Sequence, residues 1–263
     1  MIALRNLTLG YGSEPVLEGA NLDVGLGQFV SLVGPSGSGK TSLLRAVCGL
    51  HQQDAGTVSR DIAPDEIGFL FQDDALLPWR SVRHNVALGL LARGETKRAA
   101  YATADTWLDR FGLAGFGDRF PSRLSGGQRK RVALAQVLAR EPRLLLMDEP
   151  FASLDAIVRH RITGDLLQWV EREHLTVLLV THDLEEAVTV SDIVYLLSNG
   201  PRAHICERYH IPLPRPRDLV ETKSDPEFGP LYERVWHDLA REVGIETRSP
   251  RRARSGHEQG VAV

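Results

Sequence analysis

The chain has 263 residues, 43% of them hydrophobic and 25% charged, with a formal net charge of −3, which suits a soluble globular protein of one large domain or two modest ones. This charge balance argues against a nucleic-acid-binding protein, and with no long apolar run and no signal-peptide pattern we expect a cytosolic chain without a membrane span. The two cysteines, Cys48 and Cys206, are far apart and exclude a disulfide scaffold.

Apolar runs of strand length alternate with helical patterns over the first 200 residues. The runs predict strands buried on both faces of a largely parallel sheet, at Phe29 to Val33, Ile67 to Phe71, Leu144 to Met147, Thr176 to Val180 and Ile193 to Leu197. Periodic patterns predict helices between them, at Thr41 to Cys48, Arg98 to Phe111, Gln128 to Ala139, Arg159 to Glu173 and Leu184 to Val190. This alternation indicates an α/β fold.

Three regions depart from the alternation. The stretches Ala3 to Leu9 and Gln28 to Val33 flank turn-rich residues and predict an antiparallel flap. Residues 78–127 carry helical signals and predict a helical insertion. Alternate prolines in residues 211–217 exclude regular helix or central strand, and a short helix is expected at Leu231 to Val243. We therefore predict a domain of residues 1–200, an extension of 201–247 and a disordered, arginine-containing tail of 248–263.

A phosphate-binding motif follows the first predicted strand of the sheet and precedes a predicted helix. The pattern G-x-x-x-x-G-K-[ST] is satisfied by Gly34, Pro35, Ser36, Gly37, Ser38, Gly39, Lys40 and Thr41. Its glycines let backbone N–H groups surround phosphate oxygens at a positive helix end. Lys40 neutralises the phosphates and the Thr41 hydroxyl can bind Mg²⁺. The alternative, a Gly/Ser-rich turn that only caps a helix, does not require the whole pattern.

A second predicted strand delivers two acids. Asp148 and Glu149 end the run that begins at Leu144. Because ligands of open α/β sheets bind outside the carboxyl ends of the strands, Asp148 can hold Mg²⁺ through water and Glu149 can polarise an attacking water. The alternative is a solvated acidic turn at the end of a strand.

Polar residues also follow two further predicted strands. Gln72 follows the run from Ile67, and His182 follows the run from Thr176. If all these strands are parallel, Gln72 reaches the metal or the attacking water and His182 reaches the γ-phosphate. Taken alone, Gln72 is typical of a surface residue, and Asp183 with Glu186 is typical of a helix cap.

A glycine pair precedes the helix predicted from Gln128. Ser125 and Gln128 form an S-x-x-Q capping box, which a well-capped helix explains. Gly126 and Gly127 are not needed for capping, and they leave bare N–H groups that make a second anion site. A single triphosphate in one chain has no use for two such sites unless a second copy supplies one of them.

These motifs resemble, in order and over about residues 1–200, the nucleotide-binding subunits of ABC transporters. The resemblance is carried by GPSGSGKT, Gln72, LSGGQ, LLLMDE, Ser153-Leu154-Asp155 and His182. It implies a P-loop hydrolase core of the RecA type with an antiparallel flap and a helical subdomain, and ATP with Mg²⁺ as ligands. It implies a head-to-tail dimer in which each ATP lies between one phosphate loop and the other copy's Ser125 to Gln128. It makes Glu149 the general base, His182 the γ-phosphate sensor and residues 153–155 a link across the dimer.

The same resemblance adds two contacts to the nucleotide. Tyr11 matches the aromatic that stacks on adenine, the alternative being a surface aromatic in a turn. Thr41-Ser42 replaces the commoner Ser-Thr order, but both hydroxyls remain, so contacts to Mg²⁺ and to the α-phosphate are retained. The resemblance thus implies that the nucleotide contacts include Ser42 and, across the dimer, Asp155.

The segment after Gln72 resembles one subfamily, the importers of nitrate, sulfonate and taurine, which also includes ATPases for thiamine-precursor pyrimidines. The matches are ALLPW at residues 75–79 and the proline-arginine stretch at residues 213–218. The resemblance implies separate permease subunits, a solute-binding protein and a peripheral position on the cytoplasmic face of the membrane. The candidate permease contacts are Leu76, Leu77, Pro78 and Trp79. The alternative for Trp79 is packing inside the helical insertion.

Two other classes compete. Soluble ABC ATPases of DNA or ribosomes usually carry two cassettes or a long coiled-coil insertion, and this chain has neither pattern. The arginines of residues 248–263 read as a solvated tail rather than a lipid or nucleic-acid anchor, because no apolar face accompanies them.

Overall fold

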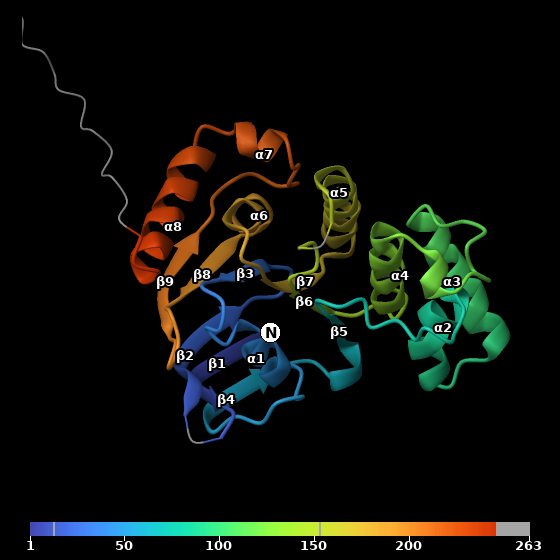
Figure 1. The fold of residues 1–263 in the computed structure, drawn as a ribbon, viewed down its shortest axis with the longest axis horizontal. Helices are drawn as coiled ribbons and strands as arrows, with labels where there is room; N and C mark the ends of the chain where they lie inside the picture. Colours follow the sequence, from blue (N-terminus) through green and yellow to red (C-terminus); the bar gives the residue numbers. More distant parts are fainter. Residues whose placement is uncertain (13, 153, 246–263) are drawn as a thin grey trace, which may run out of the picture.

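The computed structural model describes residues 1–12, 14–152 and 154–245. The predicted tail of residues 248–263 and Ser153 of the predicted dimer link lie outside these ranges. The described chain forms two sheets and the helices that cover them (Figure 1). None of its described helices is both long enough and apolar enough to cross a membrane.

The larger sheet has the strand order β5-β6-β7-β3-β8-β9. Strands β5 to β8 of this order are mutually parallel and β9 pairs with β8 in the antiparallel sense, which confirms the predicted α/β class. The bounds are β3 (Phe29–Val33), β5 (Ile67–Leu70), β6 (Leu144–Asp148), β7 (Thr176–Val180), β8 (Ile193–Leu197) and β9 (Ile205–His210).

Both faces of this sheet are covered, which explains the continuous apolar runs. Leu144 and Leu146 of β6 pack in one cluster with α1 (Lys40–Val47), whereas Leu145 and Met147 pack in another with α5 (Ala156–Glu173). Successive side chains of a strand point to opposite faces, so a strand between two helical layers has no solvent-facing position. The helix α6 (Leu184–Val190) packs in a third cluster against β8.

The smaller sheet is the predicted flap, but its strands differ from those expected. Its order is β2-β1-β4, all antiparallel, with β1 (Ile2–Gly10), β2 (Pro15–Val24) and β4 (Ala55–Arg60). The prediction that Gln28 to Val33 belongs to the flap is wrong, because β3 is buried along its whole length and lies between β7 and β8. The flap strand β2 alternates between buried and exposed residues, as a half-covered antiparallel strand does.

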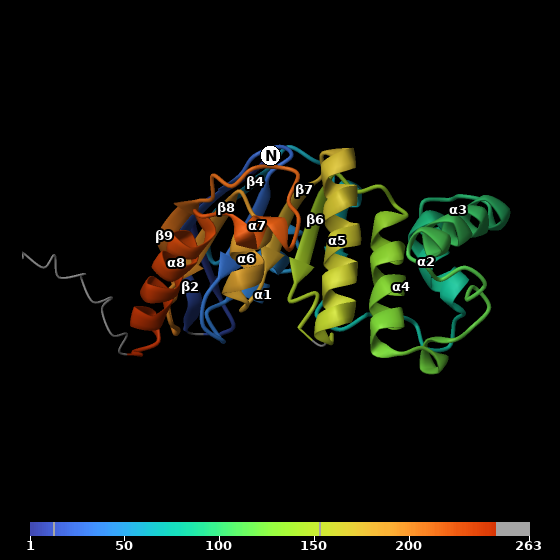
Figure 2. The ribbon, with the colours of Figure 1, turned by 90° about the horizontal axis from the view of Figure 1, so that it is seen from above.

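The helices α2 (Val82–Ala92), α3 (Lys97–Arg110) and α4 (Gly126–Leu138) pack together at one side of the sheet (Figure 2). The short 3₁₀ helices η1 (Pro64–Glu66) and η2 (Pro121–Arg123) precede β5 and α4. Both α2 and α3 begin with a side-chain cap, from Ser81 and Thr96. The two helices lie within residues 78–127, where helical signals predicted an insertion, while its exact boundaries stay a prediction.

The residues after 200 contribute β9 to the large sheet and the helices α7 (Glu221–Ser224) and α8 (Phe228–Glu242) beside it (Figure 1). The proline-rich residues 211–217 form neither helix nor strand, as predicted. Leu231 and Val235 of α8 are buried against α6 and β8. The extension from residue 201 therefore shares its core with the preceding domain.

Candidate nucleotide site

Four neighbouring parallel strands end at one edge of the large sheet, and each is followed by a residue that the sequence predicts for chemistry. In spatial order, β5 leads to Gln72, β6 to Asp148 and Glu149, β7 to His182, and β3 to the phosphate loop. The condition set by the sequence, that these strands be parallel, is met. The predicted residues therefore gather at the carboxyl edge of the sheet, where open α/β sheets bind ligands.

The phosphate loop curls from the end of β3 into the first turn of α1. Gly37 and Gly39 have φ of 81° and 85°, a region that residues with a Cβ rarely adopt. A Cβ on Gly39 would also approach the Val16 side chain to 3.1 Å. Gly39 is the N-cap of α1 and has no side chain to satisfy the first N–H groups of the helix. These N–H groups are therefore left for an anion.

Lys40 lies inside this loop. Its side chain is 7% exposed, and its ammonium donates to the carbonyl oxygens of Gly34 and Pro35 at 2.9 and 2.7 Å. Burial lowers the pKa of Lys40, and the charges of Glu149 and Asp148 act against this shift. A cation held without full hydration beside an anion-binding loop is well suited to neutralise phosphate oxygens.

Thr41 and Asp148 meet across the sheet edge. The Thr41 hydroxyl donates to Asp148 Oδ1 at 3.0 Å. Asp148 is 5% exposed, and burial raises its pKa, so a nearby cation would stabilise its ionised form. Among the described residues no three His, Cys, Asp or Glu side chains gather around one point, as a protein-only transition-metal site would require. A hydroxyl and one carboxylate instead fit Mg²⁺, which takes oxygen ligands and keeps waters and phosphates.

Glu149 and His182 face one another at the ends of neighbouring strands. His182 Nδ1 lies 3.2 Å from Glu149 Oε2, and the His182 side chain is 59% exposed while that of Glu149 is 21% exposed. Glu149 has φ of 43°, outside the regions that non-glycine residues prefer. Its backbone N–H is fixed by the Val180 carbonyl of β7 at 2.9 Å. A carboxylate and an imidazole are thus held together at the open side of the site.

Gln72 presents an exposed side chain, while its backbone is anchored. The Lys130 ammonium of α4, with 1% of the side chain exposed, donates to the Gln72 carbonyl oxygen at 3.0 Å and lies 3.2 Å from Asp74 Oδ1. The same Asp74 lies 3.2 Å from Nε of Arg129. The segment after β5 is therefore tied to α4, the helix that Ser125 caps.

Ser125, Gly126, Gly127 and Gln128 lie at the start of α4. The Ser125 hydroxyl accepts from the Gln128 N–H at 3.3 Å, and Gln128 Oε1 accepts from the Ser125 N–H at 2.9 Å, so the predicted capping box is present. Ser125 and Gly126 are exposed. Asp155 caps α5 in a similar way, its carboxylate accepting from the Val158 N–H at 3.0 Å.

Tyr11 lies near the phosphate loop, as an adenine-stacking residue must. Its ring is 59% exposed, and its hydroxyl lies 3.2 Å from the Ser42 hydroxyl. The ring centroid of His51 is 4.7 Å away. The exposed Tyr11 therefore contacts the buried Ser42 of α1 through its hydroxyl.

Arg159, Glu186 and Lys130 surround these residues, and no sequence pattern gave them a part in the site. Lys130 had a usable signal, because a lysine three and four residues before Ala133 and Leu134 lies on the apolar face of a helix and needs a buried partner. Arg159 and Glu186 carry no such signal, since both fit an exposed amphipathic helix.

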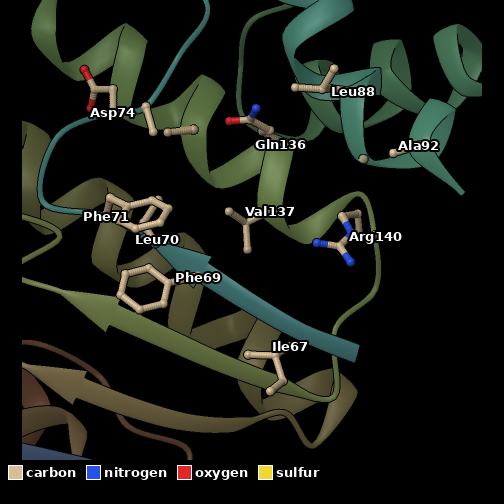
Figure 3. A pocket seen from close by; sticks show the side chains of 13 residues that line it. Ile67, Phe69, Leu70, Phe71, Asp74, Leu88, Ala92, Gln136, Val137 and Arg140 are labelled. Carbon is tan, nitrogen blue, oxygen red and sulfur yellow. The ribbon is translucent and has the colours of Figure 1, made fainter. Parts of the chain in front are cut away.

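A hollow of about 340 Å³ lies between β5, α2 and α4 (Figure 3). Phe69, Phe71 and Val137 give it an apolar wall. Trp79, which follows the lining residue Ala75 in the chain, is 69% exposed, so the alternative that Trp79 packs inside the helical insertion is wrong. The loop that carries Trp79 is fixed by the buried Asn85, whose carboxamide accepts from the Leu77 N–H at 2.7 Å.

Comparison with known proteins agrees with this geometry. The family model described as ABC transporter matches residues 17–152. The chain is 45% identical over 222 residues to "Aliphatic sulfonates import ATP-binding protein SsuB 2" of Rhodococcus jostii, covering 84% of this chain and 87% of that protein. It is 42% identical over 246 residues to "Aliphatic sulfonates import ATP-binding protein SsuB 1" of Paracoccus denitrificans, covering 94% and 95%.

Solved structures are similar in fold. The ATP-binding cassette MJ0796, in a dimeric post-hydrolysis state bound to ADP and Pi, aligns with a TM-score of 0.71 and 31% identity over 80% of this chain and 99% of its own. A second dimeric structure of MJ0796, described as a bacterial ABC transporter cassette, aligns equally well at 32% identity.

Proposed function

Because the chain belongs to the ABC transporter family, we propose that it is the ATP-hydrolysing subunit of an importer for aliphatic sulfonates. The observation that carries the ATPase assignment is the meeting of Lys40, Asp148, Glu149 and His182 at one sheet edge. The sulfonate class rests on the near full-length similarity to relatives named for sulfonate import. Nitrate or taurine importers are the nearest alternatives within the predicted subfamily.

The phosphate loop and its neighbours bind ATP in this proposal. The N–H groups at the start of α1 and the Lys40 ammonium hold the β- and γ-phosphates. Thr41, Asp148 and Gln72 hold Mg²⁺, which when bound neutralises charge on the phosphates. Tyr11 stacks on adenine and Ser42 contacts the α-phosphate.

Glu149 and His182 act on the attacking water and the γ-phosphate. Glu149 accepts the proton of the water, since its carboxylate follows β6 and is more exposed than the buried Asp148 that precedes it. His182 holds the γ-phosphate from β7, within 3.2 Å of that carboxylate. At this distance the imidazole holds the Glu149 carboxylate in an orientation that points toward the water.

A second copy completes each site. Gly126 and Gly127 present N–H groups at the exposed start of α4, where Ser125 is the N-cap. The helix α1, which follows the chain's own phosphate loop, lies apart from α4 (Figures 1 and 2). The dimeric structures of similar cassettes support a dimer of this chain. We place the γ-phosphate of one copy against Ser125 of the other, with Asp155 near the same junction. Closure of the two copies is then driven by ATP, and hydrolysis reopens them.

The importer's membrane path lies in separate permease subunits. The contact for a permease helix is formed by Leu76, Leu77, Pro78 and the exposed Trp79, which follow Ala75 of the apolar hollow in the chain. In this proposal the chain is a peripheral subunit at the inner face of the membrane.

Replacement of Glu149 by Gln tests the assignment. ATP binding is retained, steady-state hydrolysis falls by at least about 100-fold, and ATP now holds the copies together as a dimer on size-exclusion chromatography. Glu141→Gln, an exposed acid before the other end of β6, is the matched control and keeps the wild-type rate. Hydrolysis by Glu149→Gln at the wild-type rate would exclude Glu149 as the base.

The solute is tested separately by uptake. Cells that carry the chain with its permease take up a labelled alkanesulfonate, and Glu149→Gln abolishes this uptake. If uptake of nitrate rather than of the sulfonate depends on the chain, the sulfonate class is wrong while the ATPase assignment stands.

A further inference from the structure

The residues on either side of His182 are joined by hydrogen bonds that bypass it. The Thr181 hydroxyl donates to Glu186 Oε2 at 2.6 Å and accepts from the Asp183 N–H at 3.0 Å. Glu186 in turn donates its own N–H to Asp183 Oδ1 at 3.0 Å. The loop that carries His182 is therefore clamped by one hydroxyl, and that hydroxyl is oriented by Glu186.

Asp183 and Glu186 have the spacing of a helix cap, but only half of a capping box is formed. Asp183 does cap α6, but the Glu186 carboxylate does not return to the Asp183 N–H. It instead turns inward to Thr181, and its other oxygen, Oε1, is buried without a hydrogen-bond partner in the described chain. Burial and the charge of Asp183 raise the pKa of Glu186 to about 7. Burial of an ionisable carboxylate is unfavourable, and a Glu186 that only capped α6 could do so at the surface without this burial. The buried position therefore points to a further role.

Arg159 connects this clamp to the start of α5. Its guanidinium donates to Asp183 Oδ2 at 3.2 Å and to the Leu154 carbonyl oxygen at 3.3 Å. Leu154 precedes Asp155, the N-cap of α5. The segment proposed to face the second copy is thus linked through Arg159 to the residue that follows His182.

We propose that Glu186 is a positioning residue for His182, acting through the Thr181 hydroxyl, and that Arg159 anchors the same loop to the start of α5. The clamp holds the imidazole beside the Glu149 carboxylate, at the 3.2 Å seen in the structure. This inference rests on the proposed function, in which His182 contacts the γ-phosphate. Glu186 and Arg159 themselves touch no substrate.

The surroundings of Glu186 make a clean test possible. A hollow of about 330 Å³ borders it, lined also by Arg159, Asp183 and, from the extension, Leu219. The other charged groups that face it are His182 on its own loop, Lys223 of α7, which pairs with Glu185, and the exposed His160. Glu185, next to Glu186 but exposed, is therefore the matched control.

The test compares Glu186→Leu with Glu186→Gln. The glutamine oxygen still accepts from Thr181, so Glu186→Gln keeps at least about half of the wild-type kcat, while Glu186→Leu lowers kcat by about tenfold with KM for ATP within about twofold. Thr181→Val reproduces the Glu186→Leu defect, and Glu185→Gln has no effect. A merely structural role would lower the Tm of Glu186→Leu and raise KM together with the fall in kcat.

A double-mutant cycle with His182→Ala decides the route. If Glu186 acts through His182, Glu186→Leu causes no further loss of kcat in the His182→Ala chain, and the same holds for Arg159→Met. Independent, multiplying losses would overturn the inference, as would wild-type kcat in Glu186→Leu. Wild-type kcat in His182→Ala itself would instead contradict the proposed role of His182, so the two failures are distinguishable.

Discussion

Two helices of this chain, α1 and α4, begin at a glycine-rich segment, and they differ in whether a side chain caps their first N–H groups. The N-cap of α1 is Gly39, which has no side chain to cap the helix, and the next residue, Lys40, is buried. The N-cap of α4 is Ser125, whose hydroxyl already accepts from the Gln128 N–H, and the start of this helix is exposed. Arg129 of α4 lies beside Gly126, but its guanidinium already donates to Asp74 and to the Leu124 carbonyl oxygen. The first helix start is a site that this chain completes, whereas the second offers N–H groups to a charge that comes from elsewhere.

The largest expected effect is a difference in ATP affinity between two variants, Lys40→Ala at the start of α1 and Gly126→Asp at the start of α4. Lys40→Ala weakens ATP binding to the isolated chain by about 10- to 100-fold, because a charge-assisted contact is lost. Gly126→Asp places an anion where the other copy's phosphate must lie, so turnover falls by about 100-fold while ATP affinity of the single chain stays within about twofold. Fluorescent nucleotide titration and phosphate release measure the two quantities. Equal losses of affinity in both variants would remove the distinction between the two helix starts.

Mixing these two variants sharpens the comparison. In a mixed dimer, the intact phosphate loop of the Gly126→Asp chain meets the intact Ser125 segment of the Lys40→Ala chain. An equimolar mixture therefore regains up to about a quarter of the wild-type rate, since random pairing makes half of the dimers mixed and each has one intact site. A mixture as inactive as its components would argue against composite sites.

A smaller effect concerns Asp148, which lies beside the phosphate loop at the start of α1, and its contribution to the free energy of unfolding. Burial raises the pKa of Asp148, so the folded chain holds this proton more tightly than the unfolded chain. The contribution of this proton to the free energy of unfolding is therefore present at low pH, and it is lost as the pH rises through the pKa of Asp148 in the folded chain. Asp148→Asn, which retains an acceptor for Thr41, therefore raises Tm at neutral pH relative to the wild type, and this gain shrinks on acidification. Its ATPase activity is lost, because the amide cannot supply the charge.

The smallest effect is expected at the second helix start. Ser125→Ala removes the N-cap of α4 and lowers the free energy of unfolding by about 1 kcal/mol, with no pH dependence. Denaturant titration measures this change. A change near zero would mean that Gln128 alone secures the start of α4.

The sequence predicts the residues at the ends of the buried strands better than it predicts which strands pair in the flap and which side chains support the site. Lys40, Asp148 and His182 come after runs that are almost entirely apolar, and such runs are typical of strands buried in a parallel sheet. The predicted flap included a wrong strand because β2 is half-exposed and β4 is mostly exposed, so that their pairing depends on contacts distant in sequence. Glu186 was missed for a related reason, since the same Asp-x-x-Glu spacing permits a carboxylate turned outward to its cap or inward to Thr181.

Besides leaving an N–H group free at the start of α4, Gly127 determines how a displacement of α4 is passed to α5. A Cβ at this position would lie 2.7 Å from the Val158 side chain of α5, so the bare α-carbon sets how closely α4 and α5 approach. Close-packed surfaces transmit displacement with little compression. A push on the exposed start of α4 is therefore delivered to the first turn of α5, one residue from Arg159 and its tie to the His182 loop. A second copy that contacts the start of α4 therefore also acts, through α5 and Arg159, on the position of the His182 imidazole.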